Sequence, residues 1–187
     1  MVKKKLSEMS LEELWQLFPI RLTGHQDCWK TWYCEEEKRL KKALPEMERI
    51  SHIGSTAISS IWAKPIVDIL VEIPKESNLL AYKGLIVGKG YVCMSESKQG
   101  LSFNKGYTED GFAERVFHLH VRYAGDNDEL YFRDYLNECP EVAKEYERLK
   151  LSLWKQYEYN RDAYTNAKTE FVKKYTVLAK KLYGDRY

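Results

Sequence analysis

The segment His52–Ile73, HIGSTAISSIWAKPIVDILVEI, constrains the fold of this chain more than any other stretch. A short apolar run ends at a Gly-Ser pair, and a second apolar run, from Ile66 to Val71, carries Asp68 in its interior. Such a run is typical of a strand in the centre of a sheet, where a charged carboxylate is costly unless another group pairs with it. We therefore expect Asp68 to have either a partner or a chemical role.

Hydrophobic periodicity along the rest of the chain predicts an α+β fold, with a mixed β-sheet flanked by helices and a helical C-terminal part. Strand-like patterns occur at residues 49–53, 65–73, 91–94, 101–105 and 115–123. Helical patterns occur at residues 11–18, 28–44 and 77–87, and in segments that begin near Asn127, at Pro140 and near Asn160. Asp27 is the predicted N-cap of the second helix, and Pro45 is its predicted stop.

The last predicted helix runs from about Asn160 towards Tyr183 and is amphipathic. Its apolar positions recur at steps of three and four residues, at Ala163, Ala167, Phe171, Tyr175, Leu178 and Leu182. We expect this face to pack on the rest of the molecule.

The length of 187 residues, 44% of them hydrophobic, predicts a single domain over 1–187. Within it we expect N-terminal helices over about 10–44, a sheet core over about 48–123 and C-terminal helices over about 126–187. The net charge of +2, from 30 basic and 28 acidic residues, gives no strong nucleic-acid signal.

Neither a signal-peptide pattern nor an uninterrupted apolar stretch of about 18 residues occurs, so we expect no membrane association and a cytoplasmic protein. The four cysteines, Cys28, Cys34, Cys93 and Cys139, have neither CxxC spacing nor neighbouring histidines. They are expected to be reduced thiols, some of them buried, rather than disulfides or zinc ligands.

The Gly-Ser pair is the first candidate site. Gly54 lets the backbone turn closely after the strand, and Ser55 and Thr56 offer hydroxyls and amides where a short helix could begin. Such a cluster of donors suits a phosphate group. The alternative is a simple strand-to-helix turn in which Ser55 is the N-cap.

The strand after this pair is the second candidate. Alternate residues of a strand share a face, so Asp68, Leu70 and Glu72 point one way. Two carboxylates on one face can hold a divalent cation, which phosphoryl and nucleotidyl transfer require. The alternative is an aspartate at a strand end that accepts hydrogen bonds from backbone amides.

The sequence VFHLHVRY, Val116 to Tyr123, is the third candidate because His118, His120 and Arg122 share a strand face. Two imidazoles beside a guanidinium can bind phosphate, ligate a metal or transfer protons. The alternative is a pair of structural histidines.

Taken together, HIGSTAISSIWAKPIVDILV, then HLHV, then YFRDYL, and the later Tyr146, Lys150, Tyr164 and Lys168 resemble the GrpB family. The order and spacing match from about Trp29 to Phe171. This family is similar in turn to the nucleotidyltransferases of the DNA polymerase β superfamily. Ile53-Gly54-Ser55 and Asp68 fit the pattern of that superfamily, in which a Gly-Ser turn and a short helix precede carboxylates on a strand.

The resemblance implies metal-assisted nucleotidyl transfer from a nucleoside triphosphate, or another phosphate-bearing small molecule, to an unknown acceptor. The implied catalytic residues are Asp68, His118 and His120. The implied nucleotide-binding residues are Gly54, Ser55, Thr56, Arg133, Lys150 and Lys168. The implied ligands of a divalent cation, Mg²⁺ or Mn²⁺, are Asp68, Glu72 and His120.

One position departs from the superfamily pattern, because Leu70 stands where a second carboxylate is expected. Leucine cannot bind a cation, so a non-catalytic protein that binds a nucleotide or another anion on the same fold is the main alternative. A weaker alternative is a histidine-based nucleotide hydrolase, since the strand from His118 to Arg122 resembles the His-x-His-x-His strand of histidine-triad enzymes. Arg133 has a structural alternative as well, which is ion pairing with Asp134 or Glu138 on its own helix.

Overall fold

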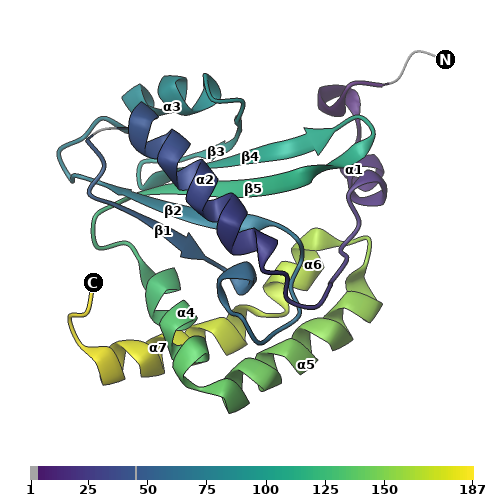
Figure 1. Ribbon diagram of the computed structural model, residues 1–187. Helices are drawn as coiled ribbons and strands as arrows, with labels where there is room; N and C mark the ends of the chain where they lie inside the picture. The colour runs from purple at the N-terminus through teal and green to yellow at the C-terminus, as the bar shows by residue number, and fades with distance from the viewer. Residues whose placement is uncertain (1–3, 45) are drawn as a thin grey trace.

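The computed structural model describes residues 4–44 and 46–187, so the predicted helix stop at Pro45 lies outside the described residues. Its centre is a five-stranded sheet in the order β1-β2-β5-β4-β3 (Figure 1). The strands are β1 (Arg49–Ile53), β2 (Val67–Ile73), β3 (Val92–Glu96), β4 (Gly100–Thr108) and β5 (Gly111–Tyr123). β2 and β5 are parallel and the other neighbours are antiparallel. The predicted α+β fold with a mixed sheet is confirmed.

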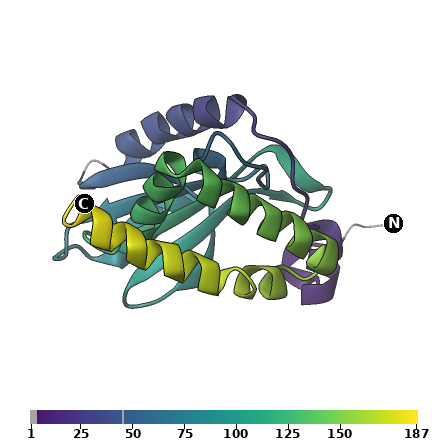
Figure 2. The same cartoon turned by 90° about the horizontal axis from the view of Figure 1, so that it is seen from below.

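Seven α-helices within the described residues surround this sheet. They are α1 (Leu11–Leu17), α2 (Cys28–Ala43), α3 (Leu79–Val87), α4 (Asp128–Glu138), α5 (Pro140–Tyr157), α6 (Arg161–Asn166) and α7 (Thr169–Tyr183). Figure 2 shows α2 on one side of the sheet and the C-terminal helices α4, α5 and α7 on the other. Two 3-10 turns, η1 (Leu6–Glu8) and η2 (Ser55–Ala57), complete the structure.

The two faces of the sheet differ in composition because residues alternate along each strand. Val67, Ile69 and Val71 of β2 lie on one face and join the main core, which α2 and α3 cover. On the opposite face, which the C-terminal helices cover, Leu70 packs against Leu130 of α4. Asp68 shares this second face, where apolar packing is incomplete.

The N-terminus of α2 differs from its prediction in one detail. Asp27 occupies the cap position, but its backbone is already helical and its side chain makes no capping hydrogen bond. Helix α5, in contrast, begins at Pro140 as predicted, where the missing N–H is not needed.

The predicted continuous C-terminal helix is wrong, because it breaks at Ala167–Lys168 into α6 and α7. Past the break, Phe171 and Tyr175 of the predicted apolar face pack into a core cluster, whereas the later positions of that face do not. The residues that α7 buries are Tyr175, Thr176 and Ala179. Leu178 and Leu182, predicted to pack, are 42% and 66% exposed.

Two smaller predictions concern the cysteines and the membrane. All four cysteines are free thiols of intermediate exposure, so the absence of disulfides is as predicted and the burial of some of them is not. Within residues 4–44 and 46–187, none of the helices is both long and apolar enough to cross a bilayer.

Candidate functional site

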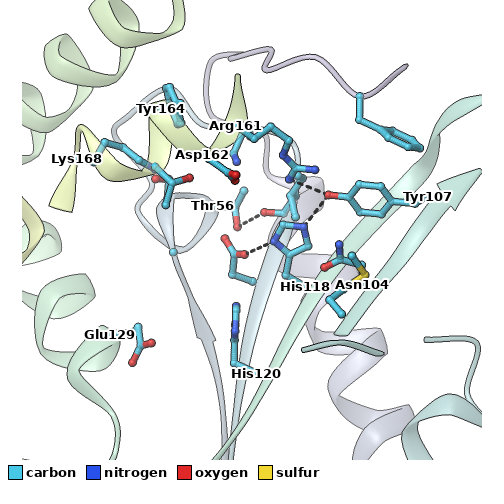
Figure 3. A pocket seen from close by; sticks show the side chains of 18 of the residues that line it. Thr56, Asn104, Tyr107, His118, His120, Glu129, Arg161, Asp162, Tyr164 and Lys168 are labelled. Atoms are coloured by element: carbon cyan, nitrogen blue, oxygen red, sulfur yellow. Dashed lines mark hydrogen bonds and ion pairs between the residues drawn. The ribbon is translucent and has the colours of Figure 1, made fainter. Parts of the chain in front are cut away.

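A cavity of about 1490 Å³ opens on the sheet face that carries Asp68 (Figure 3). Its walls come from the sheet, η2, the N-terminal segment and helices α4 to α7. Of the predicted site residues, the cavity is lined by Gly54, Ser55, Thr56, Asp68, His118, His120, Lys150 and Lys168. The structure therefore brings most of the predicted site together, although these residues are spread over more than half of the chain.

The Gly54 turn brings backbone against the Asp68 carboxylate. Gly54 has φ +70°, and a Cβ atom there would overlap the Asp68 carboxylate. A glycine is therefore required by conformation and by space. The Asp68 side chain is 27% exposed and lines the cavity.

Thr56 is used structurally, since its hydroxyl donates to the Ile66 carbonyl (3.1 Å) and lies 2.9 Å from Nε2 of His52. Burial lowers the pKa of His52 to about 4, so this imidazole is neutral at pH 7. With its hydrogen donated to Ile66, Thr56 accepts from His52. Thr56 thus supports the turn, while the Ser55 side chain lines the cavity and is hydrogen-bonded to Tyr146.

A chain of hydrogen bonds runs from Asp68 across the sheet. Asp68 and His118 are direct neighbours on the parallel strands β2 and β5, and Oδ1 of Asp68 lies 3.1 Å from Nδ1 of His118. Nε2 of His118 lies 2.8 Å from the Tyr107 hydroxyl. The Tyr107 hydroxyl in turn accepts a hydrogen bond of 2.9 Å from Arg161 of α6. Figure 3 shows the side chains of His118, Tyr107 and Arg161 pointing toward one another.

Electrostatics keep Asp68 ionised. Burial acts to raise the pKa of Asp68, but the hydrogen bond from His118 and the nearby His118, His120 and Lys64 outweigh it, and the pKa is lowered. Burial lowers the pKa of His120 to about 4. His120 is thus neutral at pH 7, and its Nδ1 lies 3.4 Å from the Ser102 hydroxyl.

Two predicted site residues lie outside the cavity lining. Glu72 is 2% exposed and accepts hydrogen bonds from Asn127 Nδ2 (2.9 Å) and the Gly125 amide (3.1 Å), while Arg49 lies 3.3 Å from its other oxygen. Its carboxylate is occupied by these groups, so it does not join Asp68 and His120.

Arg133 also follows its structural alternative. It pairs with Asp134 at 2.7 Å and donates to the His52 carbonyl at 2.9 Å. These bonds join α4 to β1, so Arg133 stabilises the wall of the site rather than reaching into the cavity.

Three lysines and one arginine of the cavity lining are buried or half-buried and form no ion pair with any carboxylate that the structure describes. Among the described residues, Lys64, Lys150, Lys168 and Arg161 form none of the ion pairs found elsewhere in the molecule. Their contacts are aromatic rings and backbone: Nζ of Lys168 lies 4.4 Å and Nζ of Lys64 5.6 Å from the centre of the Tyr164 ring, and Lys150 donates to the Trp62 carbonyl. These cations have space for an anion between them and the sheet.

Burial lowers the pKa values of the three lysines. Burial, followed by neighbouring positive charge, lowers the pKa of Lys64 and of Lys150 to about 7. Burial lowers the pKa of Lys168 to about 8, although Asp68 acts in the opposite direction. An arriving anion would restore the charged forms.

Tyr107, Lys64 and Arg161 are site residues that the sequence did not single out. Tyr107 and Arg161 carry no recognisable motif, and Lys64 lies inside the quoted Gly-Ser segment without a pattern of its own. Glu129 of α4 is a further missed residue; it lines the cavity, and burial raises its pKa.

The donor set does not fit a pair of divalent cations. Asp68 is held by His118, Leu70 offers no ligand, and Glu72 is occupied elsewhere. Throughout residues 4–44 and 46–187, no three His, Cys, Asp or Glu side chains are grouped as metal ligands. The predicted cation site at Asp68, Glu72 and His120 is therefore not assembled, and no chemical step is assigned to a metal here.

Comparison with known structures supports this fold. The crystal structure of the conserved protein GrpB from Enterococcus faecalis aligns with a TM-score of 0.76 and 29% identity, over 87% of this chain and 99% of that one. The Cid1 poly(U) polymerase aligns with a TM-score of 0.50 and 10% identity, over 84% of this chain and 51% of that one. The latter likeness concerns the fold alone, and it agrees with a nucleotidyltransferase-like core.

Sequence comparison gives the family. The glutamate-rich protein GrpB of Alkalihalophilus pseudofirmus is 36% identical over 159 residues, covering 82% of this chain and 91% of the relative. The UPF0157 protein YqkA of Bacillus subtilis is 31% identical over 90% of this chain, which spans only 50% of that relative's length. The model of the GrpB protein family matches residues 19–177. The chain therefore belongs to the GrpB family.

Proposed function

We propose that this protein binds a nucleoside triphosphate in the cavity and transfers its nucleotidyl group to an acceptor that carries a hydroxyl. The observation that carries the proposal is the set of unpaired cations, which are Lys64, Lys150, Lys168 and Arg161. Gathering like charges away from water costs free energy, and a ligand with several negative charges offsets that cost. A triphosphate is such a ligand.

The cavity has separate places for the two substrates, the triphosphate and the acceptor hydroxyl. The lysines lie on the side of α5 to α7 and would bind the triphosphate, together with the Ser55 hydroxyl. Asp68 and His118 lie on the sheet, beside the space where an acceptor hydroxyl would approach. The Cid1 poly(U) polymerase, described with Mg and 3'-dATP bound, has the same fold, which supports a nucleotide as the ligand.

Charge balance in this proposal comes from the protein. In the superfamily pattern a carboxylate pair holds cations that neutralise the phosphates, whereas this chain has Leu70 at the second carboxylate position. Lys64, Lys150 and Lys168 would supply that positive charge instead. Nucleotide binding without a divalent cation follows from this proposal.

A second candidate is binding of the nucleotide without chemistry. Leu70 favours it, because the absence of a second carboxylate removes the usual means of activating the attacking group. The Asp68–His118 pair favours transfer, because a binding pocket has no need of a hydrogen-bonded carboxylate and imidazole next to its cations.

The test is calorimetric titration of ATP, GTP, CTP, UTP and inorganic tripolyphosphate, in EDTA and in Mg²⁺ or Mn²⁺, with pyrophosphate release measured in parallel. We expect binding in EDTA that Lys168→Gln weakens, and pyrophosphate release once a hydroxyl acceptor is supplied. Lys181→Gln, an exposed lysine of α7 outside the cavity, is the matched control.

Asp68→Asn separates charge balance by lysines from charge balance by a cation. Without a metal, the Asp68 carboxylate repels the triphosphate, so the variant should bind ATP in EDTA at least as tightly as the natural chain. If the natural chain fails to bind ATP in EDTA, and Asp68→Asn fails to bind it even with a divalent cation, a cation at Asp68 is required. Binding without pyrophosphate release would support the second candidate, and failure of every nucleotide and of tripolyphosphate to bind would refute both.

A further inference from the structure

We propose that Tyr107 is the catalytic residue that accepts the proton of the attacking hydroxyl, as the ligand-facing end of a relay through His118 to Asp68. The inference rests on the proposed nucleotidyl transfer. It assigns a proton acceptor to a site in which Leu70 stands in place of a second carboxylate. Its foundation is the directed set of hydrogen bonds that links four elements of the fold.

The position of Tyr107 depends on an irregularity in β4. Asn104 pairs with His118 and Lys105 with Phe117, so in an unbroken strand Tyr107 would lie on the face of Lys105, towards α2. The register shifts between Lys105 and Tyr107, at Gly106. This shift returns the Tyr107 side chain to the cavity face, where it meets His118.

Gly106 makes this irregularity possible. It has φ +91°, and a Cβ atom there would overlap the Arg115 carbonyl on the neighbouring strand. Both the conformation and the close approach exclude a side chain. Gly106 thus permits the register shift that places the Tyr107 side chain on the cavity face.

The donors and acceptors of the relay fix its direction. Ionised Asp68 accepts from Nδ1–H of His118, which leaves Nε2 as an acceptor for the Tyr107 hydroxyl. Burial raises the pKa of Tyr107 although Arg161 opposes it, so Tyr107 is protonated at neutral pH and can donate. Its oxygen has two lone pairs, of which Arg161 uses one, and the other is open to a ligand hydroxyl.

The reaction step follows from this direction. The acceptor oxygen attacks the α-phosphorus and a new P–O bond forms, while the bond from that phosphorus to pyrophosphate breaks. The proton of the attacking hydroxyl passes to the Tyr107 oxygen as the proton of Tyr107 passes to Nε2 of His118. The result is an imidazolium beside the Asp68 carboxylate, and Arg161 stabilises the negative charge that develops on the phenol oxygen.

The experiment compares the natural chain with Tyr107→Phe, which removes only the hydroxyl, and with Tyr159→Phe, an exposed tyrosine outside the cavity, as control. ATP affinity is measured by calorimetry, and kcat and KM by pyrophosphate release with a hydroxyl acceptor. We expect Tyr107→Phe to lower kcat by about 100-fold or more with ATP affinity and KM within about twofold, because general-base catalysis contributes about that much. Tyr159→Phe should match the natural chain.

The outcomes separate the relay from the proposed function. Pyrophosphate release from Tyr107→Phe at the natural rate would overturn the relay and leave nucleotidyl transfer standing. Failure of the natural chain to bind nucleotides, or binding without release, would overturn the proposed transfer and this role of Tyr107 with it. Nitrogen NMR of His118 gives an independent check: protonated Nδ1 with unprotonated Nε2 supports the relay, and the reverse tautomer overturns it.

Discussion

Two regions of buried charge on opposite faces of the sheet differ in how their charges are paired. Under α2, Glu36 is 1% exposed and accepts from Lys105 (2.6 Å), Tyr91 (3.1 Å) and Arg39 (3.3 Å). In the cavity, Lys64, Lys150 and Lys168 form no ion pair among the described residues, although the charge of Asp68 acts on Lys64 and Lys168 and that of Glu147 on Lys150. The buried carboxylate of the first region is paired by direct contacts, and the lysines of the second region are not.

The two carboxylates of β2 show the same contrast along one strand. Glu72 is surrounded by the donors of Asn127, Gly125 and Arg49, all of which hold neighbouring elements together. Asp68, four residues away on the same face, is bonded to His118 and still faces the cavity. A buried carboxylate that is bonded to neighbouring elements is thus a structural element, and one that faces a cavity is a candidate for chemistry.

The largest expected effect is on the complete region. Glu36→Ala leaves Lys105 and Tyr91 without their shared acceptor, and removing one partner of a buried ion pair costs about 3–5 kcal/mol. Because Lys105 can still reach water, we expect the lower end, about 3 kcal/mol, in urea unfolding. ATP affinity should change by less than about twofold, and a loss of stability under about 1 kcal/mol would show that the Glu36 cluster is not structural.

The next prediction concerns the cavity, where a substitution should reduce ATP affinity and not stability. Lys168→Gln should weaken ATP binding by about 10- to 100-fold, since a hydrogen bond to a charged group contributes about 1.5–3 kcal/mol. The free energy of unfolding should stay the same or rise, because Lys168 has no ion pair to break and burial disfavours its charge. A large loss of stability with unchanged affinity would place Lys168 with the structural charges instead.

The last prediction concerns pH: as the pH rises, the affinity for tripolyphosphate should fall and the free energy of unfolding should rise. Lys64 and Lys150, with pKa values of about 7, and Lys168, at about 8, lose charge as the pH rises, so tripolyphosphate affinity should fall by about tenfold or more between pH 7 and pH 9. Binding should also take up protons, which calorimetry in two buffers measures. Affinity that is constant over this range would contradict the assigned site.

The sign for stability is opposite. Each folded-state pKa lies below the ordinary lysine value of 10.5, so between about pH 7 and 10.5 the unfolded chain binds more protons than the folded one. The contribution of these lysines to the free energy of unfolding therefore rises with pH across that window. Urea unfolding of the natural chain and of Lys64→Met over the same pH range measures the difference.

The parts of the fold that follow from local pattern could be predicted from the sequence. The strand at Arg49–Ile53 has the predicted bounds, and Pro140 begins α5, because alternation and the missing proline N–H act locally. The two faces of β2 and β5 were also predictable, which placed Asp68, His118 and His120 on one side.

The remaining features depend on geometry that no local pattern carries. The site role of Tyr107 arises from the irregularity at Gly106, which reverses the face of the strand. Lys64 and Arg161 come from distant parts of the chain and meet only in the folded structure, where both line the cavity. Glu72 was predicted as a metal ligand because it shares a face with Asp68, but Gly125 and Asn127 of the loop after β5 donate hydrogen bonds to its carboxylate.

The most direct test of the central claim, that the unpaired cations form a triphosphate site, is a crystal structure with a non-hydrolysable ATP analogue. The account predicts the phosphates within hydrogen-bond distance of Lys64, Lys150 and Lys168, and the α-phosphate facing Tyr107 and His118. An analogue bound elsewhere, with these lysines still bonded only to rings and backbone, would contradict it.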